Sequence, residues 1–202
     1  MPLFRGTFAQ VLAVALGALI WAPEVLAQDL PGRRDALRQV FEADAPIETV
    51  IFPDPSLSDA EVQLLSNAVT QGLLPDMVFY GAIAIAPDRG LADPQTTIAV
   101  GNFHDVEAAS DAARARCDVA RDGEGADCVL VMQVRPAGWA PGQPLQLSVG
   151  AVEALRGEFR SAGRPRVFSI SPGTGNFGIG GDEGAANLAC GAADCRPVVS
   201  DR

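Results

Sequence analysis

Two stretches of the chain repeat the same succession of apolar runs, turns and helical spacing. In the first stretch, apolar runs over residues 79–86 and 96–100 flank a Pro-x-x-Gly turn, and a third run covers 129–134. Before the third run, Asp105 is placed to cap a helix whose apolar positions recur every three or four residues as far as Cys117. The pattern therefore predicts a β-β-α-β unit.

The second stretch has the same order in a shorter form. Apolar runs over 166–171 and 177–180 flank a Pro-Gly-Thr-Gly turn. Asp182 or Glu183 can begin an alanine-rich helix, and a final strand runs to Val199. Because the two stretches share strands, turn, acidic cap and helix in one order, we expect an internal duplication of a β-β-α-β unit.

From these units we expect an α+β fold, stabilised by disulfide bonds, with a mixed or mostly antiparallel sheet and the helices on one side. Within each unit the last strand is expected to pair beside the first, which gives the strand order 2-1-3.

Other helices are predicted outside the two units. Ser58 and Glu61 form a capping-box pattern that begins a helix to Gln71. Between the units, Ser148 can cap an amphipathic helix over residues 147–160. A short helix is expected over 33–43, with the rest of residues 28–56 extended. The expected organisation is: a signal peptide (1–27), an N-terminal helical or extended segment (28–76), and a single α+β domain (77–202) made of repeat 1 (77–135), a connector and helix (136–163) and repeat 2 (164–202).

The N-terminal residues have the pattern of a secretory signal peptide. Arg5 precedes an unbroken apolar run over residues 11–22, which is short for a membrane span, and small or modest side chains stand before Gln28. We expect cleavage after Ala27, a periplasmic or secreted protein, and no membrane span after cleavage. No cysteine lies near the cut, so a lipid anchor is not expected.

Composition excludes several classes of chemistry. The formal net charge is −10, and an acidic surface repels phosphate backbones, so no nucleic acid partner is expected. All 15 basic residues are arginine; without lysine, Schiff-base and pyridoxal phosphate catalysis are excluded. His104 is the single histidine, so a zinc site built from two or three histidines cannot form within one chain. We expect no cofactor and no metal.

The four cysteines allow three disulfide pairings. If the duplication is real, Cys117 pairs with Cys128 and Cys190 with Cys195. The chain-entropy estimate is about 3 and about 2 kcal/mol for these two loops, and longer cross-unit loops would stabilise more, so energetics leaves the pairing open. Neither spacing is the Cys-x-x-Cys of a redox pair.

Some side chains are weak candidates for function, each beside a structural alternative. His104 stands at a helix start, where a neutral imidazole could act as a base or simply fill a structural place. Asp182 and Glu183, or the acids of residues 118–127, could serve a carboxylate hydrolase, and the latter could bind Ca²⁺ or be a solvated loop. Trp139 either anchors the connector on the core or contacts a ligand.

A glycine motif over residues 173–178 matches Gly-x-Gly-x-x-Gly after a predicted strand. The expected helix does not open at its third glycine, so we interpret the motif as a hairpin turn rather than a nucleotide loop.

The run from Tyr80 to Ala84, the alanine-rich helix that ends at Cys117 and the strand that begins at Asp127-Cys128 together resemble a family of small exported bacterial domains of unknown function. The resemblance covers residues 78–134. Members commonly carry a further cysteine after the third strand, which this chain lacks. The whole chain is also similar to longer exported proteobacterial proteins that carry a 5-aminolevulinate synthase label. That activity is not expected here, because it needs a lysine to hold pyridoxal phosphate.

Taken together, these observations favour an exported, non-enzymatic binding or accessory module. Its expected partner is an unidentified protein or small molecule in the periplasm. The alternative is a small exported hydrolase that uses carboxylates.

Overall fold

The computed structural model describes residues 30–69, 71–72, 74 and 77–202. The predicted signal peptide and its cleavage site lie outside the described residues. The elements in chain order are α1 (Arg33–Leu37), β1 (Ile47–Ile51), α2 (Asp59–Ala68), β2 (Gly81–Ile85), β3 (Ile98–Val100), α3 (Val106–Ala120), β4 (Val129–Pro136), α4 (Val149–Arg156), α5 (Glu158–Ser161), β5 (Arg166–Ile170), β6 (Phe177–Gly180), α6 (Glu183–Cys190) and β7 (Arg196–Asp201).

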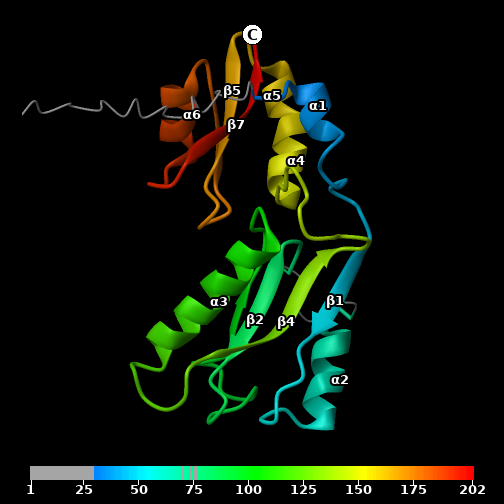
Figure 1. Cartoon of the computed structure of the whole chain (residues 1–202), viewed down its shortest axis with the longest axis vertical. Coiled ribbons are helices and arrows are strands. Elements are labelled where there is room, and N and C mark those ends of the chain that lie inside the picture. The colour runs from blue at the N-terminus through cyan, green and yellow to red at the C-terminus, as the bar shows by residue number, and fades with distance from the viewer. Residues whose placement is uncertain (1–29, 70, 73, 75–76) are drawn as a thin grey trace, which may run out of the picture.

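The strands form two antiparallel sheets in two lobes (Figure 1). We call the sheet of order β1-β4-β2-β3, with α2 and α3, the first lobe. The sheet of order β6-β5-β7, with α1, α4, α5 and α6, is the second lobe. The α+β class is confirmed, and within each unit the last strand does pair beside the first. The expectation of a single sheet is wrong: among the described residues, β5, β6 and β7 pair only with one another, and the outer edge of β4 is occupied by β1.

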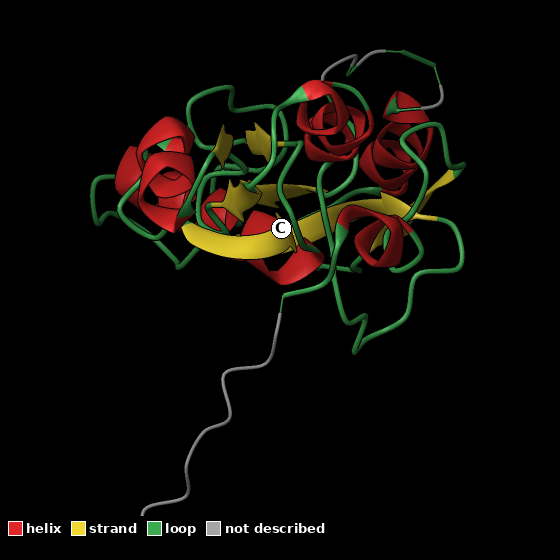
Figure 2. Ribbon diagram, turned by 90° about the horizontal axis from the view of Figure 1, so that it is seen from above, coloured by secondary structure: helices red, strands yellow, loops and turns green. Residues whose placement is uncertain are grey.

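Helices cover both faces of each sheet, so the expectation of helices on one side is also wrong (Figure 2). The physical reason is that β2 and β5 are buried along their whole length and need cover on both sides. In β2, Ala82 packs in the same cluster as residues of α3, whereas Ile83 packs in another with Leu65 of α2. In β5, Phe168 and Ile170 pack in a cluster with residues of α4 and α5.

Two glycines of β6 let α6 approach the second sheet closely. A Cβ at Gly178 would lie 2.2 Å from the backbone nitrogen of Cys190 and 2.4 Å from the carbonyl oxygen of Ala186. At Gly180 it would lie 2.3 Å from the backbone nitrogen of Ala186. Such distances are far inside van der Waals contact, so this packing requires residues without a side chain.

Local capping signals give the helix starts that the sequence predicts. Asp105 accepts a hydrogen bond from the backbone N–H of Ala108, and Asp182 accepts one from that of Ala185. Ser58 and Glu61 form the reciprocal capping box of α2. The helix expected over residues 147–160 is divided into α4 and α5, because the backbone at Gly157 (φ −95°, ψ −83°) leaves the helical region.

The N-terminal segment contributes to both lobes. In the second lobe, the backbone N–H of Arg33 donates to a carboxylate oxygen of Asp201 at 2.9 Å, and that of Ser200 donates to the carbonyl oxygen of Pro31 at 3.1 Å. The chain then crosses to the first lobe, where Ile47–Ile51 (β1) pairs with β4. The segment therefore crosses from one lobe to the other.

The disulfides join Cys117 to Cys128 and Cys190 to Cys195, as the two-unit pattern predicts. Each bond ties a helix to the chain that enters the last strand of its lobe. The loops they close span 11 and 5 positions, for which chain entropy gives about 3 and about 2 kcal/mol of stabilisation.

Candidate functional site

A cleft of about 610 Å³ lies where the two lobes meet. Its volume is in the range of ordinary ligand sites. Its walls come from four parts of the chain: the N-terminal segment, the residues before α3, the connector before α4 and strands of the second lobe. The lining residues are Leu30, Pro31, Gln39, His104, Asp105, Gln143, Pro144, Leu145, Gln146, Ile170, Arg196, Pro197 and Val198.

His104 joins the two lobes beneath this cleft. The ring is 1% exposed; Nε2 lies 2.9 Å from the carbonyl oxygen of Asn176, and the backbone N–H of Ser148 donates to Nδ1 at 3.2 Å. A backbone N–H can only donate, so Nδ1 accepts, and Nε2 carries the proton that it donates to Asn176. Both ring nitrogens of the neutral imidazole are therefore occupied by backbone groups of the second lobe.

Through these two hydrogen bonds His104 holds the first lobe against the second. Burial lowers the pKa of the imidazole, while the Asn176 carbonyl, Asp105 and Asp194 act in the opposite direction. Because Nδ1 already accepts a hydrogen bond, its lone pair does not face the cleft as a base would. Sequence reasoning placed His104 correctly at a helix start, but neither of its partners is near it in the chain.

Close backbone contacts complete the junction around Asn102. Its side-chain oxygen accepts a hydrogen bond from the backbone N–H of Gly150 at 3.3 Å. A Cβ at Gly175, where φ is +79°, would lie 2.4 Å from the carbonyl oxygen of Asn102. The glycine motif over residues 173–178 thus forms the turn between β5 and β6. Its Gly175 allows the close contact with Asn102 of the first lobe, and its Gly178 allows the close packing of α6. The hairpin interpretation of this motif agrees with this arrangement.

We expect the stability of the protein to depend on His104 below pH 6.5. The unfolded histidine takes up a proton at its ordinary pKa of 6.5, whereas the folded one does so only at lower pH. The contribution is therefore complete above pH 6.5 and is lost as the pH falls towards the folded pKa, at no more than about 1.4 kcal/mol per pH unit. Urea unfolding between pH 5 and 8 should show this slope in the wild type and its absence in His104→Gln. Parallel curves would contradict it.

The cleft walls combine amide side chains with apolar surface. Gln39, Gln143 and Gln146 supply amide donors and acceptors, and Arg196 supplies a cation. Gln146 is held in place by Trp139, whose indole N–H donates to its side-chain oxygen at 2.8 Å. Trp139 also packs against the core of the first lobe, with the Arg135 guanidinium 4.8 Å from its ring centre.

The edge strand β7 runs along one wall of the cleft. It is an outer strand of its sheet, and Arg196, Pro197 and Val198 line the cleft. Farther along β7, the backbone of Ser200 already binds Pro31 on the same outer side. The outer edge of β7 therefore offers backbone groups to an extended segment, as in strand addition, although Pro197 supplies only its carbonyl oxygen because it has no N–H.

The carboxylate candidates lie elsewhere. Asp182 caps α6 and Glu183 occupies its first turn; both are exposed and neither lines the cleft. The acids of residues 118–127 belong to the first lobe, so the structure does not bring the two sets together.

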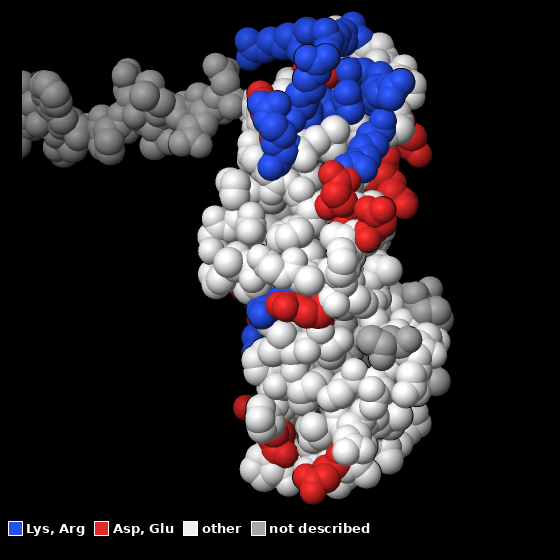
Figure 3. Space-filling view, turned by 90° about the vertical axis from the view of Figure 1, so that its right-hand side faces the viewer, with Lys and Arg blue, Asp and Glu red and all other residues white. Residues whose placement is uncertain are grey.

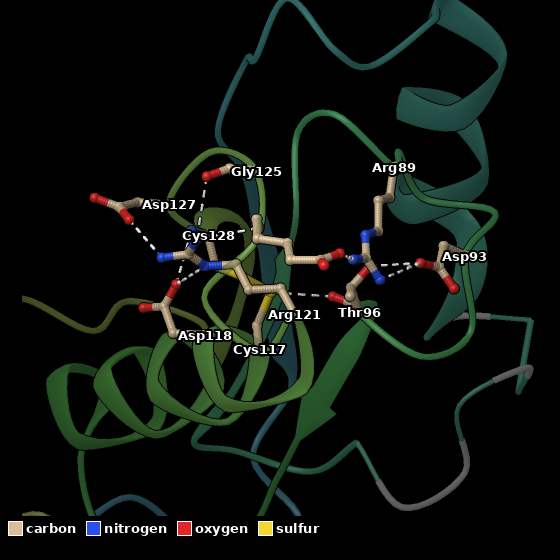
Figure 4. Close-up of a disulfide and its surroundings, with 10 residues drawn as sticks. Arg89, Asp93, Thr96, Cys117, Asp118, Arg121, Gly125, Asp127 and Cys128 are labelled. Carbon is tan, nitrogen blue, oxygen red and sulfur yellow. Dashed lines mark hydrogen bonds and ion pairs between the residues drawn. A yellow bond between two sulfur atoms is a disulfide. The ribbon is translucent and has the colours of Figure 1, made fainter.

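The acidic loop of residues 118–127 is built around an arginine (Figure 4). Arg121, whose side chain is 12% exposed, donates to Asp118 at 2.9 Å and to Asp127 at 2.6 Å. It also donates to the carbonyl oxygens of Glu124 and Gly125, both at 3.1 Å. A hydrogen bond from the backbone N–H of Cys128, followed by the Arg121 side chain, lowers the pKa of Asp118. The guanidinium thus supplies the positive charge around which the loop is arranged.

Sequence reasoning did not single out Arg196, Gln39 or the glutamines of the connector. The connector glutamines have one local signal, the Gln-Pro-Leu-Gln run at residues 143–146, and Gln39 and Arg196 have none.

Comparisons with protein-family models, curated proteins and solved structures find no match for this chain. Within residues 30–69, 71–72, 74 and 77–202, no three side chains of His, Cys, Asp or Glu come together as metal ligands. None of the helices in that part of the chain combines the length and apolar character that crossing a bilayer requires.

Proposed function

We propose that this protein is an exported, non-enzymatic binding module whose cleft between the lobes takes an extended peptide segment. The observation that carries the proposal is the composition of the cleft: an outer strand of a sheet, at residues 196–198, lines it together with side-chain amides and apolar residues of other segments. Peptide backbone can add to a sheet edge, and glutamine amides match its remaining donors and acceptors.

Export is supported by the signal-like N-terminus and by the two disulfides. The disulfides suit an oxidising compartment such as the periplasm or the exterior. A binding rather than catalytic role is supported by His104, whose two nitrogens are both engaged by backbone groups.

We further propose that the two lobes arose by duplication of a β-β-α-β unit. Beyond the shared strand order, both first strands carry a register shift at the same place, between their third and fourth residues: Ile83/Ala84 in β2 and Phe168/Ser169 in β5. Each lobe also has an aspartate-capped helix and a disulfide to the entry of its last strand. A common ancestor explains the shared irregularity more simply than independent origins do.

The binding proposal is tested by panning a random heptapeptide phage library on the purified protein and measuring the selected peptides by isothermal titration calorimetry. Pro144→Trp would fill the cleft from an exposed position on its wall, and Pro141→Trp, exposed on the same connector but outside the cleft, is its matched control. We expect at least about tenfold weaker binding to the first variant and unchanged binding to the second.

Two outcomes would overturn the proposal. One is that no peptide is enriched, or that selected peptides bind both tryptophan variants as they bind the wild type. The other is cleavage of the bound peptides, detected by mass spectrometry, which would favour the carboxylate hydrolase instead.

A further inference from the structure

A second hollow, of about 440 Å³, lies at the end of the second lobe where α1 meets the start of β5. Four arginines and two aspartates line it: Arg33, Arg34, Arg164, Arg166, Asp35 and Asp201. Figure 3 shows blue side chains gathered over this end of the molecule. The concentration is notable because the whole chain carries a net charge of −10.

Both carboxylates of the hollow are already neutralised. Asp201 accepts hydrogen bonds from Nε and Nη2 of Arg166 at 3.1 and 2.7 Å, and from the backbone N–H of Arg33. Asp35 forms an ion pair with Arg38. Neither carboxylate is therefore left to balance Arg33 or Arg34, and Asp201 is shared between Arg166 and the more distant Arg164.

Arg166 belongs to the frame of the hollow. Its side chain is 8% exposed, its Nη1 donates to the carbonyl oxygens of residues 160 and 162, and its guanidinium lies 4.9 Å from the Phe159 ring centre. These contacts use its hydrogen-bonding groups within the protein. The buried ion pair of Arg166 and Asp201 therefore forms a fixed part of the lining of the hollow.

Three further guanidinium groups line the hollow outside the buried pair of Arg166 and Asp201. Those of Arg33 and Arg34 form no ion pair with any described residue, and that of Arg164 lies 3.6 Å from Asp201 with its side chain 63% exposed. The fold brings these like charges to one hollow through the contact between Arg33 and Asp201. Their mutual repulsion favours the binding of an anion between them.

We propose that this hollow binds a phosphate group, with Arg33, Arg34 and Arg164 as its cationic ligands. Guanidinium groups donate paired hydrogen bonds to phosphate oxygens, and three of them around one hollow suit a tetrahedral dianion better than a carboxylate, which one arginine satisfies. The group could belong to a soluble phosphate ester or to a phospholipid head group. This site is separate from the cleft between the lobes and does not rest on the peptide-binding proposal.

The test measures binding of the purified protein to inorganic phosphate by calorimetry, and to vesicles of phosphatidylcholine with or without phosphatidylglycerol by co-sedimentation. Arg33→Gln/Arg34→Gln removes two of the three cations. It keeps the hydrogen bond to Asp201, because that bond comes from the backbone. Arg114→Gln/Arg116→Gln on α3 of the first lobe is the matched control, with the same change in charge.

We expect Arg33→Gln/Arg34→Gln to bind at least about tenfold more weakly, the control to bind as the wild type does, and binding to weaken as salt is raised. Loss of phosphate binding identifies a soluble source, and loss of binding to phosphatidylglycerol vesicles alone identifies a lipid source. If both double variants bound the probe equally more weakly than the wild type, the effect would come from the overall charge of the protein, and the proposed site would be overturned. If the wild-type protein bound neither inorganic phosphate nor the vesicles, the site would also be overturned. Thermal melting must show that every protein tested is folded.

Discussion

Gly178→Ala is expected to lower the free energy of unfolding by at least about 3 kcal/mol, at the upper end of what overpacking costs. The added Cβ would lie 2.2 Å from the backbone nitrogen of Cys190 and 2.4 Å from the carbonyl oxygen of Ala186. Backbone atoms of a helix held by a disulfide cannot turn aside as a flexible side chain would. Helix α6 would have to separate from the sheet, exposing the face of β5 that it covers. Urea unfolding followed by far-ultraviolet circular dichroism measures the change.

Gly181→Ala is the matched control for this prediction. The substitution is the same and the position is three residues along the chain, but the nearest atom to the added Cβ would be 3.9 Å away. We expect a change within about 0.5 kcal/mol, as at ordinary surface positions. Similar losses in the two variants would show that close packing of α6 is not what Gly178 provides.

Arg166→Met is expected to cost roughly 3–5 kcal/mol, the range for breaking a buried ion pair by removing one partner. The side chains of Arg166 and Asp201 are 8% and 11% exposed. Methionine would fill much of the volume but leave the Asp201 carboxylate without its main partner. The carbonyl oxygens of residues 160 and 162 would lose their donor as well. The same urea unfolding experiment measures the loss.

Arg164→Met separates burial from charge in this pair. Arg164 lies 3.6 Å from the same carboxylate of Asp201, but its side chain is 63% exposed. An exposed ion pair contributes little, so we expect a change of less than about 1 kcal/mol. If Arg164→Met proved as costly as Arg166→Met, the stability of this corner would depend on total charge rather than on the buried pair.

The parts of the fold that the sequence predicts are those with local signals. The caps at Asp105 and Asp182 lie next to the helices they begin, and the disulfides close short loops. The strand over Ile47–Ile51 has no such signal. Its partner β4 is about 85 positions away, and one of the contacts across the pair is between Glu48 and Arg135 at 2.5 Å. This distant pairing could not be read from either unit alone.

The candidate site depends even more on distant contacts. His104 is marked by its place before a helix, but its partners Ser148 and Asn176 stand 44 and 72 positions later. Gln39 and Arg196 meet at the cleft from opposite ends of the described chain. No spacing rule joins such residues, because their proximity comes from the way the lobes pack.

The contact between Arg33 and Asp201 also has a consequence for biosynthesis. The two residues are 168 positions apart, and a translating ribosome takes roughly 10–30 s to cover that distance. During this interval the segment around Pro31 has no β7 to bind, and for much of it β1 has no β4. The N-terminal segment therefore reaches its final contacts with the second lobe only when the last strand has been synthesised, so the complete tertiary structure forms late.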